Sequence, residues 1–251
     1  MEIEPSSGTA AAQLAVVLAE RGAVEEARRL LAPRLAAPRP APVILWAAGR
    51  VRMAEGDTLE AEAAWREALR RAPRFLPAHT AAARLRAGRG QADEALTGLR
   101  RLLAAGAPVE ELGPVIGELL LAAGRPEEAR VACRAMLEDA PGDAGLTICL
   151  ARAQAACGHP EEAASVLKSA RRRHPDNARV TRALIGVLAQ QDRWDEVARL
   201  WEPPAVPSAW PEKRRRELLE SLRRSPAAWR TEPAAVRRIM EEIAGPGPAQ
   251  P

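Results

Sequence analysis

The sequence predicts an all-α fold, a solenoid of stacked antiparallel helix pairs that ends in C-terminal capping helices. The first observation is a fixed period, because six residues lie 34 positions apart: Gly22, Gly56, Gly90, Gly124, Gly158 and then Asp192. The second observation is that apolar residues between these positions recur at the three-to-four spacing of an α-helix. A period of this length indicates helical units that bury their apolar faces by stacking on one another.

Two further positions keep the same period and support a structural interpretation. The residue four places after each period-marking residue is always acidic, and this set is Glu26, Glu60, Glu94, Glu128, Glu162 and Glu196. The following residue is Ala in five copies and Val197 in the sixth. A carboxylate in the first turn of a helix interacts favourably with the helix dipole, by ~0.3–1 kcal/mol. We therefore interpret these glutamates as residues that begin helices, not as catalytic carboxylates.

The second repeat shows how one unit is expected to fold. Residues 45–54 carry an apolar stripe at helical spacing and predict a first helix. Gly56 ends this helix because glycine tolerates the left-handed conformation at a helix end. Residues 59–71 carry a second stripe, and Pro73 ends it because proline cannot continue a helix. Each repeat is therefore expected to be two helices joined by a short turn, with small residues such as Gly49 allowing close backbone approach.

The period also predicts how the chain is divided. We expect a flexible N-terminus at residues 1–7 and a solenoid at 8–209, with repeats at about 8–41, 42–75, 76–109, 110–143, 144–177 and 178–209. A proline-rich segment at 38–42 links the first two repeats, and prolines between 203 and 211 end the array. Residues 210–245 predict two helices that cap the last repeat. The tail at 246–251 is expected to be disordered.

The 34-residue period and its Gly, Ala, aromatic and Pro positions resemble the tetratricopeptide repeat (TPR). The resemblance covers roughly residues 8 to 209. It is closest in the second repeat, where six residues fall on family positions: Gly49, Gly56, Ala61, Trp65, Ala68 and Pro73. The first helices depart from the family, since Leu45 stands where a Trp is common and Arg52 where a Tyr is common. The resemblance implies a right-handed TPR superhelix whose first helices line a concave groove.

In TPR proteins the side chains at the second, fifth and ninth positions of a repeat point into the groove, which implies a set of partner-binding candidates. These candidates are Trp46, Arg50, Arg84, Glu118, Ile148, Arg152, Arg179 and Arg182. Arginine can hold a carboxylate with two hydrogen bonds, and Trp46 would offer a flat apolar anchor. The alternative is that Trp46 packs between repeats and that the arginines reflect composition, since only Lys168 and Lys213 among the 37 Lys and Arg residues are lysines.

The sequence carries no signature of catalysis or of cofactor binding. His79, His159 and His174 do not lie at the spacing of a metal pair or a catalytic dyad. The 3 cysteines form no CxxC motif, and Cys149 and Cys157 lie too far apart along a helix to be bridged. We expect no catalytic residue, no metal and no cofactor.

Charge and hydropathy limit the expected partners and location. The formal net charge is +4, yet acidic and basic residues are interleaved, as on a solvated helical surface. We expect no nucleic-acid binding, and since no run of about 18 apolar residues occurs, no membrane insertion. The acidic first residues do not resemble a secretory signal, so a cytoplasmic location is expected.

These expectations favour a non-enzymatic adaptor or scaffold that holds a partner protein or peptide within a bacterial multi-protein complex. A partner with acidic character would suit the groove arginines. Two alternatives stay open. One is a regulatory or structural subunit of an enzyme or assembly complex. The other is a self-assembling scaffold, in which the chain forms homo-oligomers.

Overall fold

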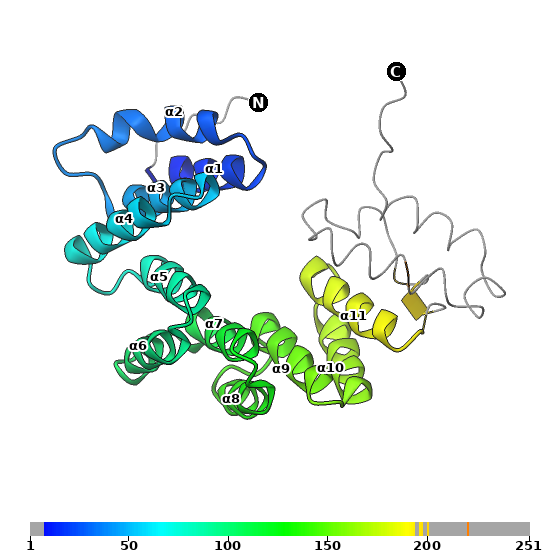
Figure 1. Ribbon diagram of the computed structural model, residues 1–251. Helices are drawn as coiled ribbons and strands as arrows, with labels where there is room; N and C mark the ends of the chain where they lie inside the picture. Colours follow the sequence, from blue (N-terminus) through cyan, green and yellow to red (C-terminus); the bar gives the residue numbers. More distant parts are fainter. Residues whose placement is uncertain (1–7, 194–195, 198–199, 201–219, 221–251) are drawn as a thin grey trace, which may run out of the picture. The chain divides into compact units, whose positions relative to one another are not determined.

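The computed structural model describes residues 8–193, 196–197, 200 and 220. Within this part of the chain all regular structure is helical (Figure 1). The predicted flexible N-terminus at 1–7 and the tail at 246–251 lie outside the described residues. So do the predicted capping helices at 210–245, apart from Glu220.

The described residues form helices at the places that the 34-residue period predicts. The helices are α1 (Gly8–Glu20), α2 (Val24–Leu35), α3 (Pro42–Glu55), α4 (Thr58–Arg71), α5 (Leu76–Gly88), α6 (Ala92–Ala104), α7 (Val109–Ala122), α8 (Pro126–Asp139), α9 (Ala144–Ala156), α10 (Pro160–Arg173) and α11 (Ala178–Gln190). The odd-numbered helices are the first helices of the predicted repeats, and the even-numbered ones are the second helices.

The chain divides into two compact units, which we call unit 1 (Met1–Gly124) and unit 2 (Arg125–Pro251). The boundary lies between the two helices of the fourth predicted repeat. In unit 1, α1 packs on α2 and α3, α3 packs on α4, and α5 packs on α6 (Figure 1). In unit 2, α9 packs on both α8 and α10, and α11 packs on α10 and α9. Each helix thus buries its apolar face against its neighbours along the chain, as expected of a repeat protein.

The turns inside the repeats confirm the reason for the recurring glycines. The five glycines that mark the period all have a positive φ, between 70° and 84°. Asp192, in the sixth place, also has a positive φ of 56°, and it is the one non-glycine residue with this conformation in the described part of the chain. Aspartate is among the few L-residues that adopt the left-handed region with any frequency. The period is therefore a period of backbone conformation, and the sixth copy keeps it without a glycine.

The core of unit 1 depends on a close contact between α3 and α4. Trp65 on α4 is only 2% exposed, and its Nε1 donates a hydrogen bond of 3.1 Å to the backbone oxygen of Trp46 on α3. A Cβ atom at Gly49 would lie 2.2 Å from Trp65 Nε1, far inside van der Waals contact. Gly49 thus allows a close approach, but the group that lies against the backbone of α3 is the indole of Trp65 and not the backbone of α4.

The proline-rich connection between α2 and α3 is anchored by a side chain of α4. Arg71 on α4 donates a hydrogen bond of 2.7 Å from Nη1 to the backbone oxygen of Pro40. Its Nε donates to Glu67 Oε1 at 2.6 Å, which fixes the direction of the guanidinium. The connection is therefore held against the repeat that follows it.

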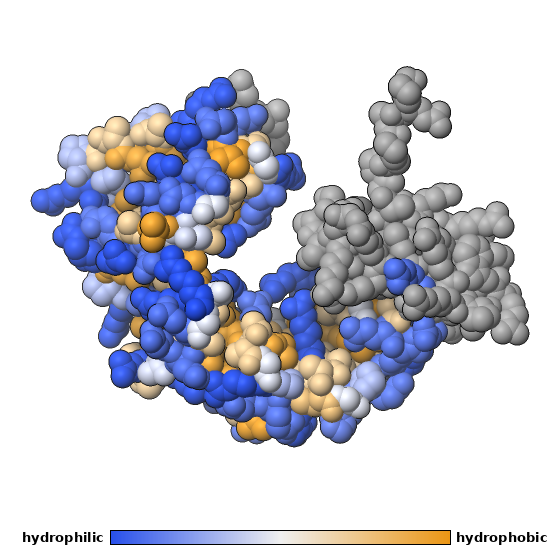
Figure 2. All heavy atoms as spheres, viewed as in Figure 1, coloured by the Kyte–Doolittle hydropathy of each residue, from blue (hydrophilic) through white to orange (hydrophobic). Residues whose placement is uncertain are grey.

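The surface carries interleaved charges, as the sequence predicts. Figure 2 shows hydrophilic residues spread over the described helices of both units, with apolar residues between them. Many of the charged residues form ion pairs within one helix, such as Arg66 with Glu62 and Arg70 with Glu67. Exposed pairs of this kind contribute little to stability, about 0–1 kcal/mol each. Their effect is mainly to keep the surface polar.

Candidate partner-binding groove

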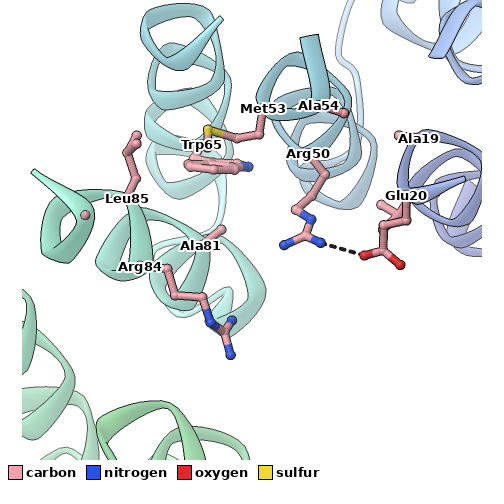
Figure 3. A pocket seen from close by; sticks show the side chains of 11 residues that line it. Ala19, Glu20, Arg50, Met53, Ala54, Trp65, Ala81, Arg84 and Leu85 are labelled. Carbon is pink, nitrogen blue, oxygen red and sulfur yellow. Dashed lines mark hydrogen bonds and ion pairs between the residues drawn. The ribbon is translucent and has the colours of Figure 1, made fainter. Parts of the chain in front are cut away.

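A pocket of about 430 Å³ opens in unit 1 between the first helices α1, α3 and α5 (Figure 3). We call it the unit 1 pocket. The residues that line it are Val16, Ala19, Glu20, Arg50, Met53, Ala54, Trp65, Ala81, Arg84, Leu85 and Gly88. All of them belong to the first three predicted repeats. Its volume falls in the range of about 300–1,000 Å³ that is usual for ligand-binding pockets.

The pocket exists because α3 and α5 contact each other much less than α1 and α3 do. Trp65, from the second helix α4, lies between α3 and α5 and forms part of the floor of the pocket (Figure 3). Ala81 and Leu85 of α5 are 5% and 9% exposed, and they continue this floor. The pocket therefore has an apolar base, made of side chains that are themselves almost wholly buried.

The rim of the pocket carries two arginines at equivalent positions of consecutive repeats. Arg50 on α3 and Arg84 on α5 are 34 residues apart, and both were predicted as groove residues. Arg50 Nη2 lies 2.6 Å from Glu20 Oε1 of α1, and Arg84 Nη2 lies 2.9 Å from Glu118 Oε2 of α7. Glu118 is itself a predicted groove residue. The structure thus brings three of the predicted residues together, in two ion pairs that join neighbouring first helices.

Sequence reasoning missed Glu20, although a signal for it exists. Val16 occupies the ninth position of the first repeat, and Glu20 follows it by one helical turn on the same helix face. Extending the groove positions by one turn would have included Glu20 on α1 and Ala54 on α3, and both line the pocket. Trp65 could not be found in this way because it belongs to a second helix.

Trp46 lies at the seam between the first two repeats and does not line the pocket. Its half-buried side chain packs against two apolar clusters, one around Ile44 and Ala47 and the other around Trp65 and Ala78. This position agrees with the alternative that Trp46 packs between repeats.

The predicted residues of unit 2 separate into one core residue and three surface residues. Ile148 on α9 is 6% exposed and belongs to the apolar core with Leu184 of α11, so it is not part of a binding surface. Arg152 on α9 and Arg179 on α11 are exposed, whereas Arg182 on α11 is half-buried. None of these arginines forms an ion pair with another described residue.

The described first helices of unit 2 also lack acidic residues. The sequences of α9 and α11 contain no Asp or Glu, so Arg152, Arg179 and Arg182 are the only charged residues on these two helices. We call these three residues the unit 2 arginines. They give α9 and α11 a positive charge that the rim of the unit 1 pocket, with two arginines and two glutamates, does not have.

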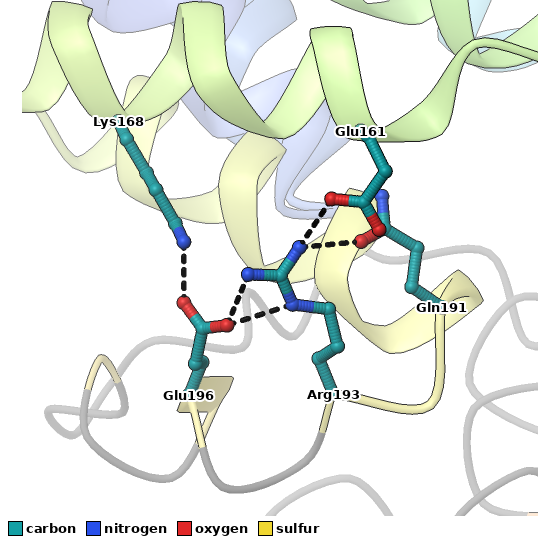
Figure 4. A network of polar contacts seen from close by, with 5 residues as sticks. All are labelled: Glu161, Lys168, Gln191, Arg193 and Glu196. Atoms are coloured by element: carbon teal, nitrogen blue, oxygen red, sulfur yellow. Dashed lines mark hydrogen bonds and ion pairs between the residues drawn. The ribbon is translucent and has the colours of Figure 1, made fainter.

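Unit 2 contains a polar network that has a structural explanation (Figure 4). Glu196 accepts hydrogen bonds from Arg193, and its Oε2 lies 2.5 Å from Lys168 Nζ of α10. Arg193 Nη1 also binds Glu161 Oε2 at 2.7 Å and Gln191 Oε1 at 2.9 Å. Lys168, followed by Arg193, lowers the pKa of Glu196. The network attaches the residues after α11 to α10, in line with the interpretation of the periodic glutamates as structural.

The cysteine closest to the surface is poorly suited to nucleophilic chemistry. Burial, and then a hydrogen bond of 3.4 Å from Cys157 Sγ to Glu127 Oε2, raise the pKa of the Cys157 thiol. A raised pKa disfavours the thiolate, which is the reactive form. Arg130, followed by the Cys157 thiol, lowers the pKa of Glu127 to about 2.

The described residues contain no group of three or more His, Cys, Asp or Glu side chains that could hold a metal ion. In the same part of the chain, we find no helix with both the length and the apolar character needed to span a bilayer.

Two protein-family models, both described as tetratricopeptide repeat, match the chain. One matches residues 8–33 and the other matches residues 120–184. These segments contain α1 with part of α2 in unit 1, and α8, α9 and α10 in unit 2. No curated protein matches the chain in sequence.

Several solved structures match the chain in fold, among them one of a TPR protein. TTC0263, a thermophilic TPR protein from Thermus thermophilus, has a TM-score of 0.57 at 18% identity, with 71% of this chain and 97% of that chain covered. The structure of pilF from Pseudomonas aeruginosa has a TM-score of 0.53 at 17% identity, with 76% of this chain and 87% of that chain covered. A chain of the APC/C hetero-tetramer Cut9–Hcn1 has a TM-score of 0.63 at 13% identity, with 96% of this chain and 50% of that chain covered.

At these identities the solved structures establish similarity of fold alone. The helix pairs, the 34-residue period and the two family matches agree with one another in both units. The chain therefore contains segments that match the tetratricopeptide repeat in both units, and its fold is that of an all-α TPR solenoid.

Proposed function

We propose that the protein is a non-enzymatic adaptor that holds a segment of a partner protein on its first helices, with the unit 1 pocket as the main contact. The observation that carries this proposal is the pocket itself, an apolar depression of about 430 Å³ with polar groups at its rim. Pockets with an apolar base and a few polar groups are the usual form of binding sites. TPR proteins typically serve as scaffolds for protein–protein interactions.

We further propose that acidic residues of the partner bind to unit 2. The unit 2 arginines make no ion pair with a described residue, whereas Arg50 and Arg84 already have carboxylate partners. An unpaired guanidinium can bind a new carboxylate without breaking an existing pair. The acidic side chains expected of the partner are therefore proposed to bind to Arg152, Arg179 and Arg182.

The cellular setting that we propose is a multi-protein complex in the bacterial cytoplasm. The similarity to a chain of the Cut9–Hcn1 hetero-tetramer supports a role within an assembly, since a related fold is found there in a complex. The enzymatic or mechanical work of the complex would belong to other subunits.

Site-specific photo-cross-linking in the native host tests the proposed function. A cross-linking amino acid at Ala54, which lines the pocket, is expected to capture a defined partner, and the same amino acid at exposed Val131 on α8 is the control. The captured partner is then purified and titrated against the chain. The double variant Arg50→Glu/Arg84→Glu should weaken binding at least tenfold, while Arg66→Glu/Arg100→Glu outside the pocket should not. Equal capture at both positions would contradict the proposal.

Self-assembly is a second candidate because α1 has an exposed apolar face. Leu14 and Val17 are 40% and 43% exposed, and they lie one helical turn apart on α1. Light scattering on the purified chain measures its mass in solution directly. A dimer that dissociates in the variant Leu14→Gln/Val17→Gln would support self-assembly, and a monomer at micromolar concentration would exclude it.

A further inference from the structure

The charged rim of the unit 1 pocket is balanced. Along the first helices α1, α3, α5 and α7 the four residues are Glu20, Arg50, Arg84 and Glu118, so two negative charges enclose two positive ones. Each arginine is paired with the glutamate on its outer side. Glu118 does not itself line the pocket, so the four charges cancel only when it is counted with its partner Arg84.

The two ion pairs also decide where the guanidiniums lie. Figure 3 shows Arg50 extending away from Trp65 and toward Glu20, while Arg84 extends away from Leu85. Arg84 is directed by Glu118, which accepts hydrogen bonds from its Nε at 3.3 Å and its Nη2 at 2.9 Å. Each guanidinium at the pocket is thus held by a glutamate of a neighbouring first helix.

The floor is built to contact apolar groups. Trp65, Ala81 and Leu85 are each 9% exposed or less, and Met53 lies beside them. Methionine adapts its shape to different apolar neighbours and packs well against aromatic rings. A carboxylate placed here would lose its water, and at Arg50 or Arg84 it would lie beside a guanidinium that already has a carboxylate partner, Glu20 or Glu118.

We propose that the unit 1 pocket takes a large apolar side chain of the partner segment, and that Glu20 and Glu118 are positioning residues that hold Arg50 and Arg84 at its rim. The proposal rests on the proposed function, because it names the chemistry that the same pocket recognises. The apolar side chain is the anchor, and the paired charges at the rim exclude an acidic side chain from the anchor position. An acidic anchor is the rival outcome of the test.

A phage-displayed library of random 12-residue peptides, selected on the immobilised full chain, tests this proposal. We expect the selected peptides to share one large apolar residue, and replacing that residue with Asp should reduce affinity at least tenfold. The variant Glu20→Gln/Glu118→Gln frees both arginines and should shift selection toward peptides that contain Asp or Glu. A shared acidic residue in peptides selected on the wild-type chain would overturn the proposal.

A pocket-filling variant shows whether the selected peptides bind at this site. Gly88 lines the pocket and has no atom within 4 Å of the place where a Cβ would lie, so the side chain of Gly88→Leu starts from open space at the pocket. Gly98 on α6 has the same open surroundings but lies outside the pocket, which makes Gly98→Leu a matched control. We expect at least a tenfold loss of peptide affinity for Gly88→Leu and none for Gly98→Leu.

Three results would overturn the apolar anchor. One is an equal effect of the two leucine variants, another is no effect of either, and the third is a selection that enriches no sequence. None of these results removes the proposed function, because cross-linking of a folded partner at Ala54 decides that separately. If cross-linking fails while peptides with an apolar anchor bind, the pocket recognises an apolar side chain but the adaptor role in the cell is wrong.

Discussion

At the scale of single residues, the contact between Gly49 and Trp65 shows how a missing side chain determines helix packing. The indole lies where a Cβ at Gly49 would be, and its Nε1 reaches the backbone of α3. The sequence alone could identify both residues, because each falls on a position typical of the repeat. It could not identify the hydrogen bond to Trp46, since this bond depends on the exact direction of the indole ring.

Replacing Gly49 with alanine should destabilise the protein by ~1–3 kcal/mol, because overpacking in a close contact forces backbone or side chains to shift. The matched control is Gly98→Ala, at an exposed helical glycine with open space around it. Alanine there should stabilise the protein by ~0.5–1 kcal/mol because it has the higher helix propensity. Chemical denaturation of both variants checks the prediction, and a neutral Gly49→Ala would contradict the close contact.

A carboxylate on α4 should make stability depend on pH in a defined range. Arg70, followed by Arg71, lowers the pKa of Glu67 to about 2. The unfolded chain has the ordinary glutamate pKa of about 4.3. Because the folded pKa is the lower one, the contribution of Glu67 to stability is complete above the unfolded pKa and is lost as the pH falls toward 2.

Denaturation of wild type and Glu67→Gln at several pH values measures this contribution. The wild type should be the more stable protein at pH 7, and the difference should shrink below about pH 5 and vanish near pH 2. Because the pair is largely exposed, added salt should also reduce the difference. A difference that stays constant over this pH range would contradict the lowered pKa.

At the scale of secondary-structure elements, the helices and their turns could be predicted well and the connection after α2 less well. Glycine at five of the six turn positions predicts the positive φ directly. The sixth turn is recognised only because the period continues to Asp192. The prolines at 38–42 predict a break in the helices. They do not predict that Arg71, from a different helix, would hold the connection in place.

The variant Arg71→Ala should loosen the connection between α2 and α3. Loss of the hydrogen bond to Pro40 should increase amide hydrogen exchange at Ala36, Ile44 and Leu45, whose hydrogen-bonded amides flank the connection, while the middle of α2 and of α3 stays protected. Arg66→Ala is the control, since Arg66 is exposed on the same helix and pairs only with Glu62. Equal exchange in the two variants would show that the anchor does not restrict the connection.

At the scale of the whole molecule, the sequence predicts a continuous array over residues 8–209, and the structure divides it into two units at Gly124 and Arg125. The period cannot reveal such a division, because it reports how each repeat folds and keeps the same register on both sides of the boundary. How far neighbouring repeats form one compact body depends on side-chain packing at each seam. The unit 1 pocket could not be predicted from the period for the same reason, since it follows from the limited contact between α3 and α5.

Damage to the core of unit 1 should remain within unit 1. Trp65→Ala removes an aromatic side chain that is 2% exposed, and it should destabilise its surroundings by ~3–5 kcal/mol. Repeat proteins are stabilised mainly by contacts between neighbours, so amide exchange should rise across α3, α4 and α5 and stay unchanged in α9 and α10. Leu59→Ala, at a side chain of the same helix that is 75% exposed, is the control. A uniform rise across the chain would show that both units unfold together.

The uniform length of the repeats has a consequence for how this protein can evolve. From Gly22 to Asp192 no insertion interrupts the spacing. A stretch of gene that encodes one repeat can therefore be duplicated or deleted without changing the helical register of its neighbours. Lineages that carry such a gene can gain or lose a whole repeat in one genetic event, and the side chains at the new seam then decide how well the altered array packs.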